Sequence, residues 1–282
     1  MKYTSEIKNQ TFEEERSLYN SKNLLVDSCK FSGPKDGESP LKESSNILVI
    51  NSHFDLRYSF WHVTNGEVRN TTFSNTARAP FWYCENIKVS GVTSESVKVF
   101  RECKNVEILD SNYISEEPFW RCNNLVVKNS KLSGFYAFFE SNNLEISDVN
   151  FTGKYSFQYN NHLRISNSVL DTKDAFWHCD DVVVEKSVIK GEYIGWYSKN
   201  MTFINCTIES HQPFCYADNL KFIDCKMPNC DLAFENSTAS GNIIGEIDSI
   251  KNPRRLDMKV DNVKEVINEN PINEVIINLT KN

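Results

Sequence analysis

The chain has 282 residues, of which 40% are hydrophobic and 12% aromatic, and its net charge is −7. The negative balance and the lack of a basic stripe exclude nucleic acid and anionic membranes as expected partners. No apolar run approaches the ~18 residues of a membrane span. The polar first ten residues contain no signal core, so we expect a cytoplasmic protein, and the nine cysteines are then expected to be reduced.

Residues 1–22 are expected to form an N-terminal cap. The segment Thr11-Phe12-Glu13-Glu14 has the spacing of a capping box, which closes the first turn of a helix. We therefore predict a short helix here, covering the open edge of the sheet that follows.

Residues 23–236 contain a repeat with a period of 19 residues. Its marker is asparagine or a close substitute, at Asn86, Asn105, Asn124, Asn143, His162, Asp181, Asn200 and Asn219. Asn46 and Asn65 extend it backwards, with a two-residue insertion after Asn65. A short fixed period indicates one structural unit stacked many times. The asparagines are expected to hydrogen-bond the backbone of the next coil.

We number each repeat from its marker asparagine, as position 0. Positions 1, 3 and 8 are apolar and position 6 is small. Position 14 is nearly always phenylalanine, at Phe60, Phe81, Phe100, Phe119, Phe138, Phe157, Phe176 and Phe214. Apolar sites two residues apart indicate strands with one buried face.

Such a repeat is long enough for three short strands and three turns, but too short for a strand, a helix and two loops. It predicts an all-β fold, a right-handed single-stranded parallel β-helix (solenoid) with 19-residue coils. A leucine-rich repeat is the alternative, although its LxxLxLxxN order is absent. The period fades after Glu235, and residues 237–282 are expected to form the last coils and a C-terminal cap. Residues 1–282 would then be a single β-helix domain.

Positions 15 and 16 carry aromatic and ionisable residues. The first includes Trp61, Trp82, Arg101, Trp120, Trp177 and Trp196, and the second His62, Glu102, Arg121, Glu140, His178, Tyr197, Tyr216 and Glu235. Their charged members indicate that both positions face outward, at a corner after the buried phenylalanine. Strict alternation would instead place tryptophan inside. The outward arrangement predicts a stripe of roughly 50 Å at the usual strand spacing.

Aromatic rings beside carboxylates and hydroxyls are typical of carbohydrate sites. The expected ligand-binding residues are Trp120, Lys154, Trp177, Lys173, Asp174, Glu192, Trp196 and Asp231. The expected catalytic residues are His178, Tyr197, Tyr216 and Glu235, with His178 or a tyrosine as base and Glu235 as acid or charge partner. The alternative is a purely structural ladder, since stacked aromatic pairs contribute about 0.5–1.5 kcal/mol each.

Other clusters are interpreted as structural. Glu102 and Glu140 would flank Arg121 at a spacing near that of inverting glycosidases, but the arginine would keep both carboxylates ionised. The stacked Cys84, Cys103 and Cys122 favour plain packing over a thiolate metal site. Calcium at Asp180-Asp181 is the weaker alternative to two solvated acids. We expect no metal ion and no cofactor.

Several segments carry a family resemblance. They are GESPLKE (Gly37 to Glu43), LRYSFWH (Leu56 to His62), KYSFQY (Lys154 to Tyr159), DTKDAFWH (Asp171 to His178), GEYIGWYS (Gly191 to Ser198), QPFCY (Gln212 to Tyr216) and DLAFE (Asp231 to Glu235). In order and spacing, the chain from about residue 9 to 255 resembles an uncharacterised family of right-handed β-helix proteins. The resemblance implies a pectin-lyase-like fold and no established activity.

The sequence thus predicts a carbohydrate-binding or carbohydrate-processing protein, as a hydrolase or lyase if it is an enzyme. Its ligand would be an oligosaccharide or glycoconjugate. The alternative is a non-enzymatic scaffold whose stripe binds another protein or forms a homodimer, because exposed aromatic stripes are also typical of interfaces.

Overall fold

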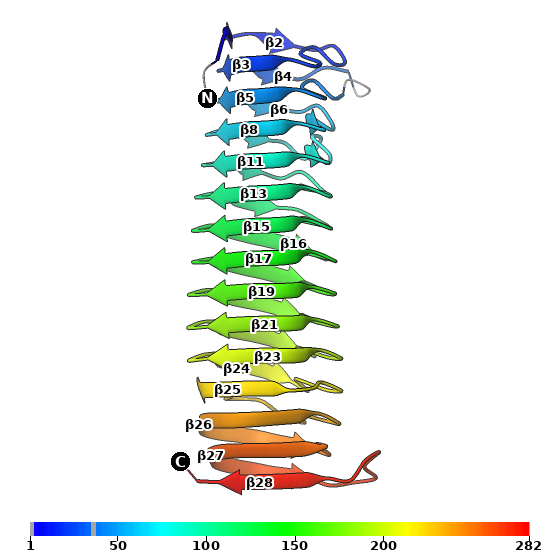
Figure 1. Cartoon of the computed structure of the whole chain (residues 1–282), viewed down its shortest axis with the longest axis vertical. Helices are drawn as coiled ribbons and strands as arrows, with labels where there is room; N and C mark the ends of the chain where they lie inside the picture. Colours follow the sequence, from blue (N-terminus) through cyan, green and yellow to red (C-terminus); the bar gives the residue numbers. More distant parts are fainter. Residues whose placement is uncertain (1–2, 35–37, 282) are drawn as a thin grey trace. The chain divides into compact units, whose positions relative to one another are not determined.

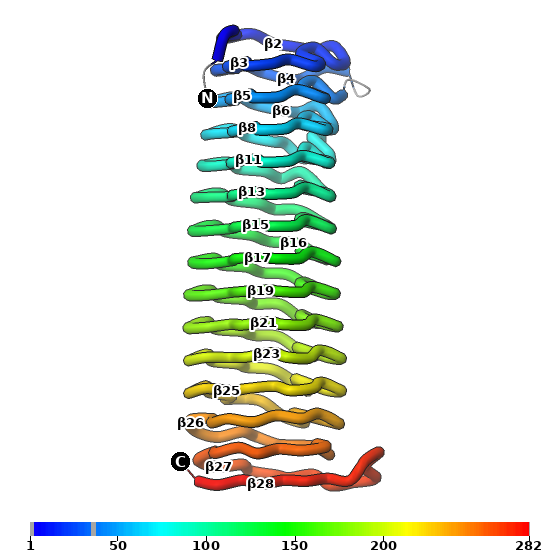
Figure 2. Tube along the Cα trace, viewed as in Figure 1, coloured from blue at the N-terminus to red at the C-terminus, as the bar shows by residue number. Residues whose placement is uncertain are grey.

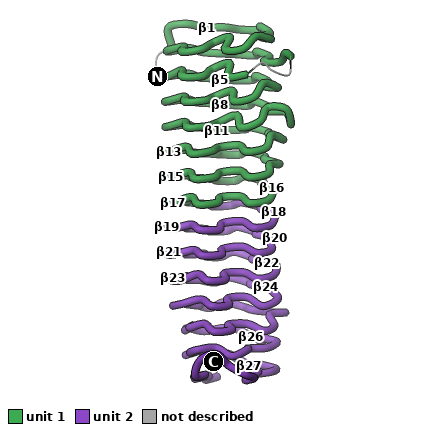
Figure 3. The backbone as a smooth tube through the Cα atoms, turned by 90° about the vertical axis from the view of Figure 1, so that its right-hand side faces the viewer, with its two compact units in different colours: residues 1–145 green, residues 146–282 purple. Residues whose placement is uncertain are grey.

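The structure is a computed structural model that describes residues 3–34 and 38–281. Residues 1, 2 and 282 of the expected caps lie outside the described residues. The chain divides into two compact units, residues 1–145 (unit 1) and residues 146–282 (unit 2), which Figure 3 colours separately. Across the two described ranges no segment is helical, so neither range has a helix that could cross a membrane.

Unit 1 is a stack of parallel strands (Figure 1). Its long sheet has the order β1 (Ser5–Lys8), β3 (Lys22–Asp27), β5 (Ser45–Ile50), β8 (Thr64–Arg69), β11 (Glu85–Ser90), β13 (Lys104–Leu109), β15 (Asn123–Lys128). Its second sheet has the order β2 (Thr11–Phe12), β4 (Lys30–Phe31), β6 (His53–Phe54), β9 (Thr72–Phe73), β12 (Thr93–Ser94), β14 (Asn112–Ile114), β16 (Lys131–Phe135). β7 (Phe60–Trp61) and β10 (Phe81–Trp82) form a separate pair. β17 (Asn142–Ser147) contains the boundary between the units.

Unit 2 repeats the same plan. Its long sheet has the order β19 (Asn161–Ser166), β21 (Asp180–Glu185), β23 (Lys199–Ile204), β25 (Leu220–Cys225), β26 (Thr238–Lys251), β27 (Arg255–Ile267), β28 (Ile276–Thr280). Its second sheet has the order β18 (Asn150–Lys154), β20 (Val169–Lys173), β22 (Val188–Glu192), β24 (Thr207–His211). The Cα trace shows each coil repeating the path of the one before it (Figure 2).

The predicted right-handed parallel β-helix is confirmed. Strands pair in parallel at the predicted interval, as where Val106 pairs with Leu125 and Val182 with Met201. The insertion after Asn65 is also confirmed, because Ile87 pairs with Gly66. The leucine-rich alternative is wrong, since every regular element of the described residues is a strand.

The phenylalanine column fills the interior of both units. Phe81 and Phe100 stack with ring centroids 4.3 Å apart, and Phe157 and Phe176 with centroids 5.0 Å apart. All four rings are fully buried. Position 14 therefore faces inward, as predicted, and from Phe100 onward these residues adopt left-handed φ values, for example 56° at Phe100 and 59° at Phe176. The left-handed residues turn the chain at the corner of each coil.

The marker asparagines form a ladder whose bonding differs from the prediction. The side-chain amide of Asn105 donates to Oδ1 of Asn86 at 2.9 Å, and that of Asn124 donates to Oδ1 of Asn105 at 2.9 Å. The partner is thus the equivalent side chain of the preceding coil, not the backbone of the next. The reason is conformational: φ is 55° at Asn105, and asparagine tolerates this left-handed region better than most residues.

The predicted N-terminal helix is wrong. Thr11–Phe12 is strand β2, and it pairs with Lys30–Phe31 of β4. The ring of Phe12 stacks on that of Phe31 at 5.0 Å, and Phe31 in turn stacks on Phe54 at 4.4 Å, so Phe12 extends the apolar stack of position 8. A partner strand with an apolar ring to pack against outweighs a local capping signal, because most helical stability in proteins comes from tertiary packing.

The cysteine columns are packed inside, as predicted. Cys84, Cys103 and Cys122 are buried and free. Burial raises the pKa of the Cys103 and Cys122 thiols well above the usual value for cysteine. Such thiols stay protonated and unreactive, which fits packing.

Candidate functional site

Ionisable residues end the strands of the second sheet in unit 2. Lys154, Lys173, Glu192 and His211 are the last residues of β18, β20, β22 and β24, and Asp231 pairs with His211 on the next coil. The register places Lys154 beside Lys173 and Glu192 beside His211. We call these five residues the polar column. The outward orientation of the column follows from strand alternation, because the residues before it, such as Thr172 and Ser210, are buried.

Neighbours in the polar column hold one another through hydrogen bonds between coils. Lys173 donates to the carboxylate of Glu192 on the next coil. His211 Nδ1 lies 2.9 Å from both carboxylate oxygens of Asp231. The hydrogen bond raises the pKa of Lys173 and lowers that of Glu192. These side chains are about half-exposed, so the pairs orient the groups without removing them from solvent.

Asp174 directly follows the column and is the most enclosed of the predicted binding residues. Its side chain is 9% exposed, and its carboxylate lies 3.9 Å from Lys154 Nζ. Burial raises the pKa of this carboxyl, against the opposing attraction of Lys154 and Lys173. The carboxylate oxygens of Asp174, beside two lysines, could accept hydrogen bonds from a ligand hydroxyl.

This pKa shift predicts the stability of an Asp174→Asn variant. A raised folded-state pKa means that the ionised carboxylate costs stability, and the cost grows as the pH rises through the folded-state pKa. At neutral pH the variant is therefore expected to melt at a higher temperature than the wild type. Near about pH 3, where the carboxyl is neutral in both states, the difference should vanish. Thermal unfolding followed by circular dichroism at both pH values measures this, and a less stable variant at neutral pH would contradict it.

The two tryptophans of unit 2 lie over the turn that follows the polar column. The indole Nε1 of Trp177 donates to the carbonyl of Tyr193 at 2.7 Å, and that of Trp196 to the carbonyl of Gln212 at 2.9 Å. Their ring centroids are 5.5 Å apart with planes at 8°. Each indole thus covers one face of the other, and both are half-buried rather than projecting into solvent.

Three of the four predicted catalytic residues stack in one column. The rings of Tyr159, His178, Tyr197 and Tyr216 follow one another at centroid distances of 4.8, 5.1 and 5.1 Å, with planes within 11°. We call this set the aromatic stack. Burial, followed by the charge of Glu235, raises the pKa of Tyr216. The structure therefore brings His178, Tyr197 and Tyr216 together, with their ring faces covering one another.

Glu235 lies outside this column, contrary to its predicted position. One extra residue precedes Asp231, whose partner His211 is 20 residues earlier instead of 19. Consequently Tyr216 N bonds the carbonyl of Glu235 at 2.8 Å, where Tyr197 N bonds that of Cys215. Glu235 therefore occupies the column of the tryptophans. Its carboxylate lies 3.0 Å from Lys251 and accepts from Gln212 at 3.1 Å.

The predicted residues of unit 1 form ion pairs and cation–π contacts. Trp120 lies under the Arg101 guanidinium, 4.5 Å from its ring centroid, and its Nε1 donates to the carbonyl of Tyr136 at 2.6 Å. Arg121 Nε donates to Glu140 at 2.7 Å, which supports the interpretation of this column as a charge ladder.

The acidic pair Asp180-Asp181 binds cationic and amide side chains. Asp181 accepts two hydrogen bonds from Arg164 at 2.9 and 3.0 Å, and Asp180 lies 3.3 Å from Lys199. Among residues 3–34 and 38–281, no three histidine, cysteine or acidic side chains are arranged to hold a metal ion.

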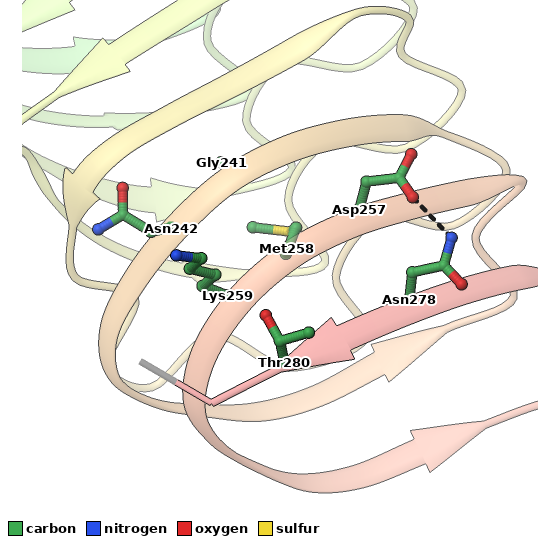
Figure 4. Close-up of a pocket in the computed structure, with 7 residues that line it drawn as sticks. All are labelled: Gly241, Asn242, Asp257, Met258, Lys259, Asn278 and Thr280. Atoms are coloured by element: carbon green, nitrogen blue, oxygen red, sulfur yellow. Dashed lines mark hydrogen bonds between the residues drawn. The ribbon is translucent and has the colours of Figure 1, made fainter.

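A pocket of about 670 Å³ lies on β26, β27 and β28, and none of the predicted site residues lines it (Figure 4). Gly241 and Met258 contribute to its lining, and Asp257 accepts from Asn278 at 2.6 Å. Asp257 also accepts from Arg255 at 2.6 Å, so its carboxylate is occupied by the protein itself. The pocket therefore adds no ionisable group free for a ligand beyond Lys259.

The sequence interpretation missed His211 and Tyr193. The Tyr193 ring contacts Lys173 at 5.3 Å and the rings of His211 and Trp196 at 5.6 and 5.5 Å, so it links the column to the tryptophans. The signal was present, since His211 follows Glu192 by one period. His211 lies at position 11 of its repeat, together with Lys154, Lys173 and Glu192, which were predicted to bind ligand but were not recognised as one column.

Comparisons with known proteins identify a family and distant structural neighbours. The profile of a family described as "Protein of unknown function (DUF3737)" matches residues 5–278. No curated protein matches the chain. PfbA, a surface adhesin of Streptococcus pneumoniae, is 10% identical with a TM-score of 0.41, over 93% of this chain and 82% of PfbA. The A-module of the Azotobacter vinelandii mannuronan C-5 epimerase AlgE4 is 9% identical with a TM-score of 0.35, over 98% and 89% of the two chains. Such distant similarity says nothing about what this chain binds.

Proposed function

Since the chain belongs to the DUF3737 family of proteins of unknown function, membership supplies no activity, and we propose one from the surface of unit 2. The proposal is that unit 2 binds an oligosaccharide or glycoconjugate along the polar column, beside Trp177 and Trp196. It rests on the chemistry of the described side chains alone.

The mixed and pre-organised charge of the polar column carries the proposal. Lys173 holds Glu192 and Asp231 holds His211, so donors and acceptors follow one another at the ~4.8 Å spacing of strands. Sugar hydroxyls both donate and accept hydrogen bonds, and they match such a surface. A polyanion or a polycation would instead require side chains of one sign.

The tryptophan pair supplies the apolar part of the same surface. Carbohydrate sites combine aromatic area with a few polar groups of fixed orientation. The bonds from each indole to the backbone of the next coil hold the pair rigidly, so a ligand would order few side chains on binding. Because Trp177 and Trp196 cover one another, contact with a sugar falls on their outer faces and edges.

The test is a glycan array followed by calorimetry with the glycan that binds. We expect His211→Ala and Lys173→Ala each to weaken binding at least roughly tenfold, since each leaves its carboxylate partner without its hydrogen-bonding neighbour. The matched control is Lys199→Ala, which breaks an exposed ion pair with Asp180 in the same unit but outside the column. This variant should bind like the wild type.

Two outcomes would overturn the proposal: no glycan binds above background, or all three variants bind equally.

Self-association through the aromatic stack is the second candidate, favoured by the 46% exposure of both Tyr159 and Tyr197. Concentration-dependent dimerisation that is lost in Tyr197→Ser, measured by sedimentation, would support it. Release of reducing ends from a bound glycan would extend the first proposal from binding to processing.

A further inference from the structure

Three large apolar side chains lie exposed together in unit 1. Ile114, Phe135 and Tyr136 are 55%, 50% and 41% exposed. Ile114 is the last residue of β14, and Phe135 ends the neighbouring strand β16. We call these three residues the apolar patch. A cluster of this kind is unlike the scattered single apolar residues of ordinary protein surfaces, and it is typical of a contact site.

The fold gives Phe135 no structural role of its own. It ends its strand at the position that Lys154, Lys173, Glu192 and His211 occupy in unit 2, a position that faces solvent. Unlike the interior phenylalanines, its ring has no aromatic partner among the residues that the structure describes. Half of the Phe135 side chain is therefore exposed to water, and no aromatic stacking with another described residue offsets the free-energy cost of that exposure.

Two carboxylates border the apolar patch. Ser94 pairs with Tyr113, so the next residues, Glu95 and Ile114, are neighbours on adjacent coils. Glu117 N bonds the carbonyl of Phe135 at 2.8 Å, which places Glu116 beside Phe135 in the same way.

These two carboxylates lack cationic partners. Within the described ranges, neither Glu95 nor Glu116 forms an ion pair, and both are exposed. The adjacent Glu117, by contrast, lies 3.2 Å from Lys98 and 2.8 Å from Arg101. In the described part of the chain, the carboxylates of Glu95 and Glu116 therefore remain unpaired at the edge of the apolar patch, whereas Glu117 is already paired with two cations.

We propose that the apolar patch is a docking site for a segment of another protein, in which an apolar side chain is flanked by lysine or arginine. The apolar side chain would cover Ile114 and Phe135, and its basic neighbours would pair with Glu95 and Glu116. Protein interfaces have this anatomy, with an apolar and aromatic centre and a charged rim. The inference does not depend on the proposed glycan site, because every residue involved lies in unit 1.

The probe is a pair of fluorescent synthetic peptides, one with leucine flanked by lysines and one with leucine flanked by glutamates. Fluorescence anisotropy is expected to show saturable binding of the basic peptide only, weakening as salt is added. Phe135→Ser and Ile114→Ser should each weaken it at least roughly tenfold. Glu95→Gln combined with Glu116→Gln should weaken it and remove most of its salt dependence.

Matched controls come from exposed residues elsewhere in the chain. Val169→Ser removes an apolar side chain that is 42% exposed in unit 2, and Glu145→Gln removes an exposed carboxylate on β17. Both should bind the basic peptide like the wild type, and melting temperatures check that every variant is folded. The proposal is overturned if neither peptide binds, if both bind equally, or if Phe135→Ser leaves the affinity unchanged. A glycan that binds this patch in place of the peptide would overturn it as well.

Discussion

Replacing Phe176 with alanine is expected to lower the free energy of unfolding by about 3–5 kcal/mol. The ring is fully buried and stacks on Phe157 with centroids 5.0 Å apart and planes at 10°. Its loss removes apolar burial and leaves a cavity, because the coils above and below are fixed by their hydrogen bonds and cannot collapse into the space. Urea unfolding followed by far-ultraviolet circular dichroism measures the change.

The control is Phe176→Leu. Leucine keeps most of the apolar volume and has the same Cβ strain at φ 59°, so its cost should be clearly smaller than that of alanine. Left-handed strain is common to phenylalanine, leucine and alanine, so it cancels in both comparisons. Equal losses for leucine and alanine would contradict the claim that filled apolar volume sets the stability at this position.

The second large effect is expected at the asparagine ladder. Asn105→Ala should cost roughly 1–3 kcal/mol, from left-handed strain on alanine and from two lost amide bonds. The side chain of Asn105 donates to Asn86 and accepts from Asn124, both at 2.9 Å. Asn105→Gly separates the two causes, because glycine adopts φ 55° freely but cannot bond its neighbours. The same urea titration should rank glycine between wild type and alanine, and a glycine variant as unstable as alanine would contradict the role of backbone strain.

The fold was predictable because each coil repeats the same physical demands. A buried phenylalanine, as at Phe157, and two apolar strand positions, as at Val182 and Val184, recur at one interval and specify both strand faces. The N-terminal helix was mispredicted for the converse reason. A local signal such as that at Thr11 competes with pairing to Lys30–Phe31, a strand that a local pattern cannot include.

The candidate site was only partly predictable, because small register changes alter which residues meet. A single extra residue before Asp231 moves Glu235 from the aromatic stack to the tryptophan column. No composition signal marks that residue, since any turn can absorb one more. The partners of the indole N–H groups were equally hidden, because Trp177 bonds a backbone carbonyl, that of Tyr193, which any residue would supply.

The members of the polar column were predictable from the sequence, but their pairing was not. Lys173, Glu192 and Asp231 were predicted to bind ligand, and the structure places them in one column with His211. Lys173 and His211 each reach a carboxylate on the next coil, and this depends on side-chain conformation, which the position in the repeat does not specify.

The histidines allow the most direct test of the glycan proposal. Unit 2 contains His162, His178 and His211, and unit 1 contains the other two of the five in the chain. Imidazole signals can be followed by nuclear magnetic resonance while the glycan found on the array is titrated into the intact chain. The proposal predicts that the His211 signals move with the midpoint measured by calorimetry, while those of His162, also paired with an aspartate, stay in place. A saturating glycan that leaves His211 unmoved, or shifts only histidines of unit 1, would contradict it.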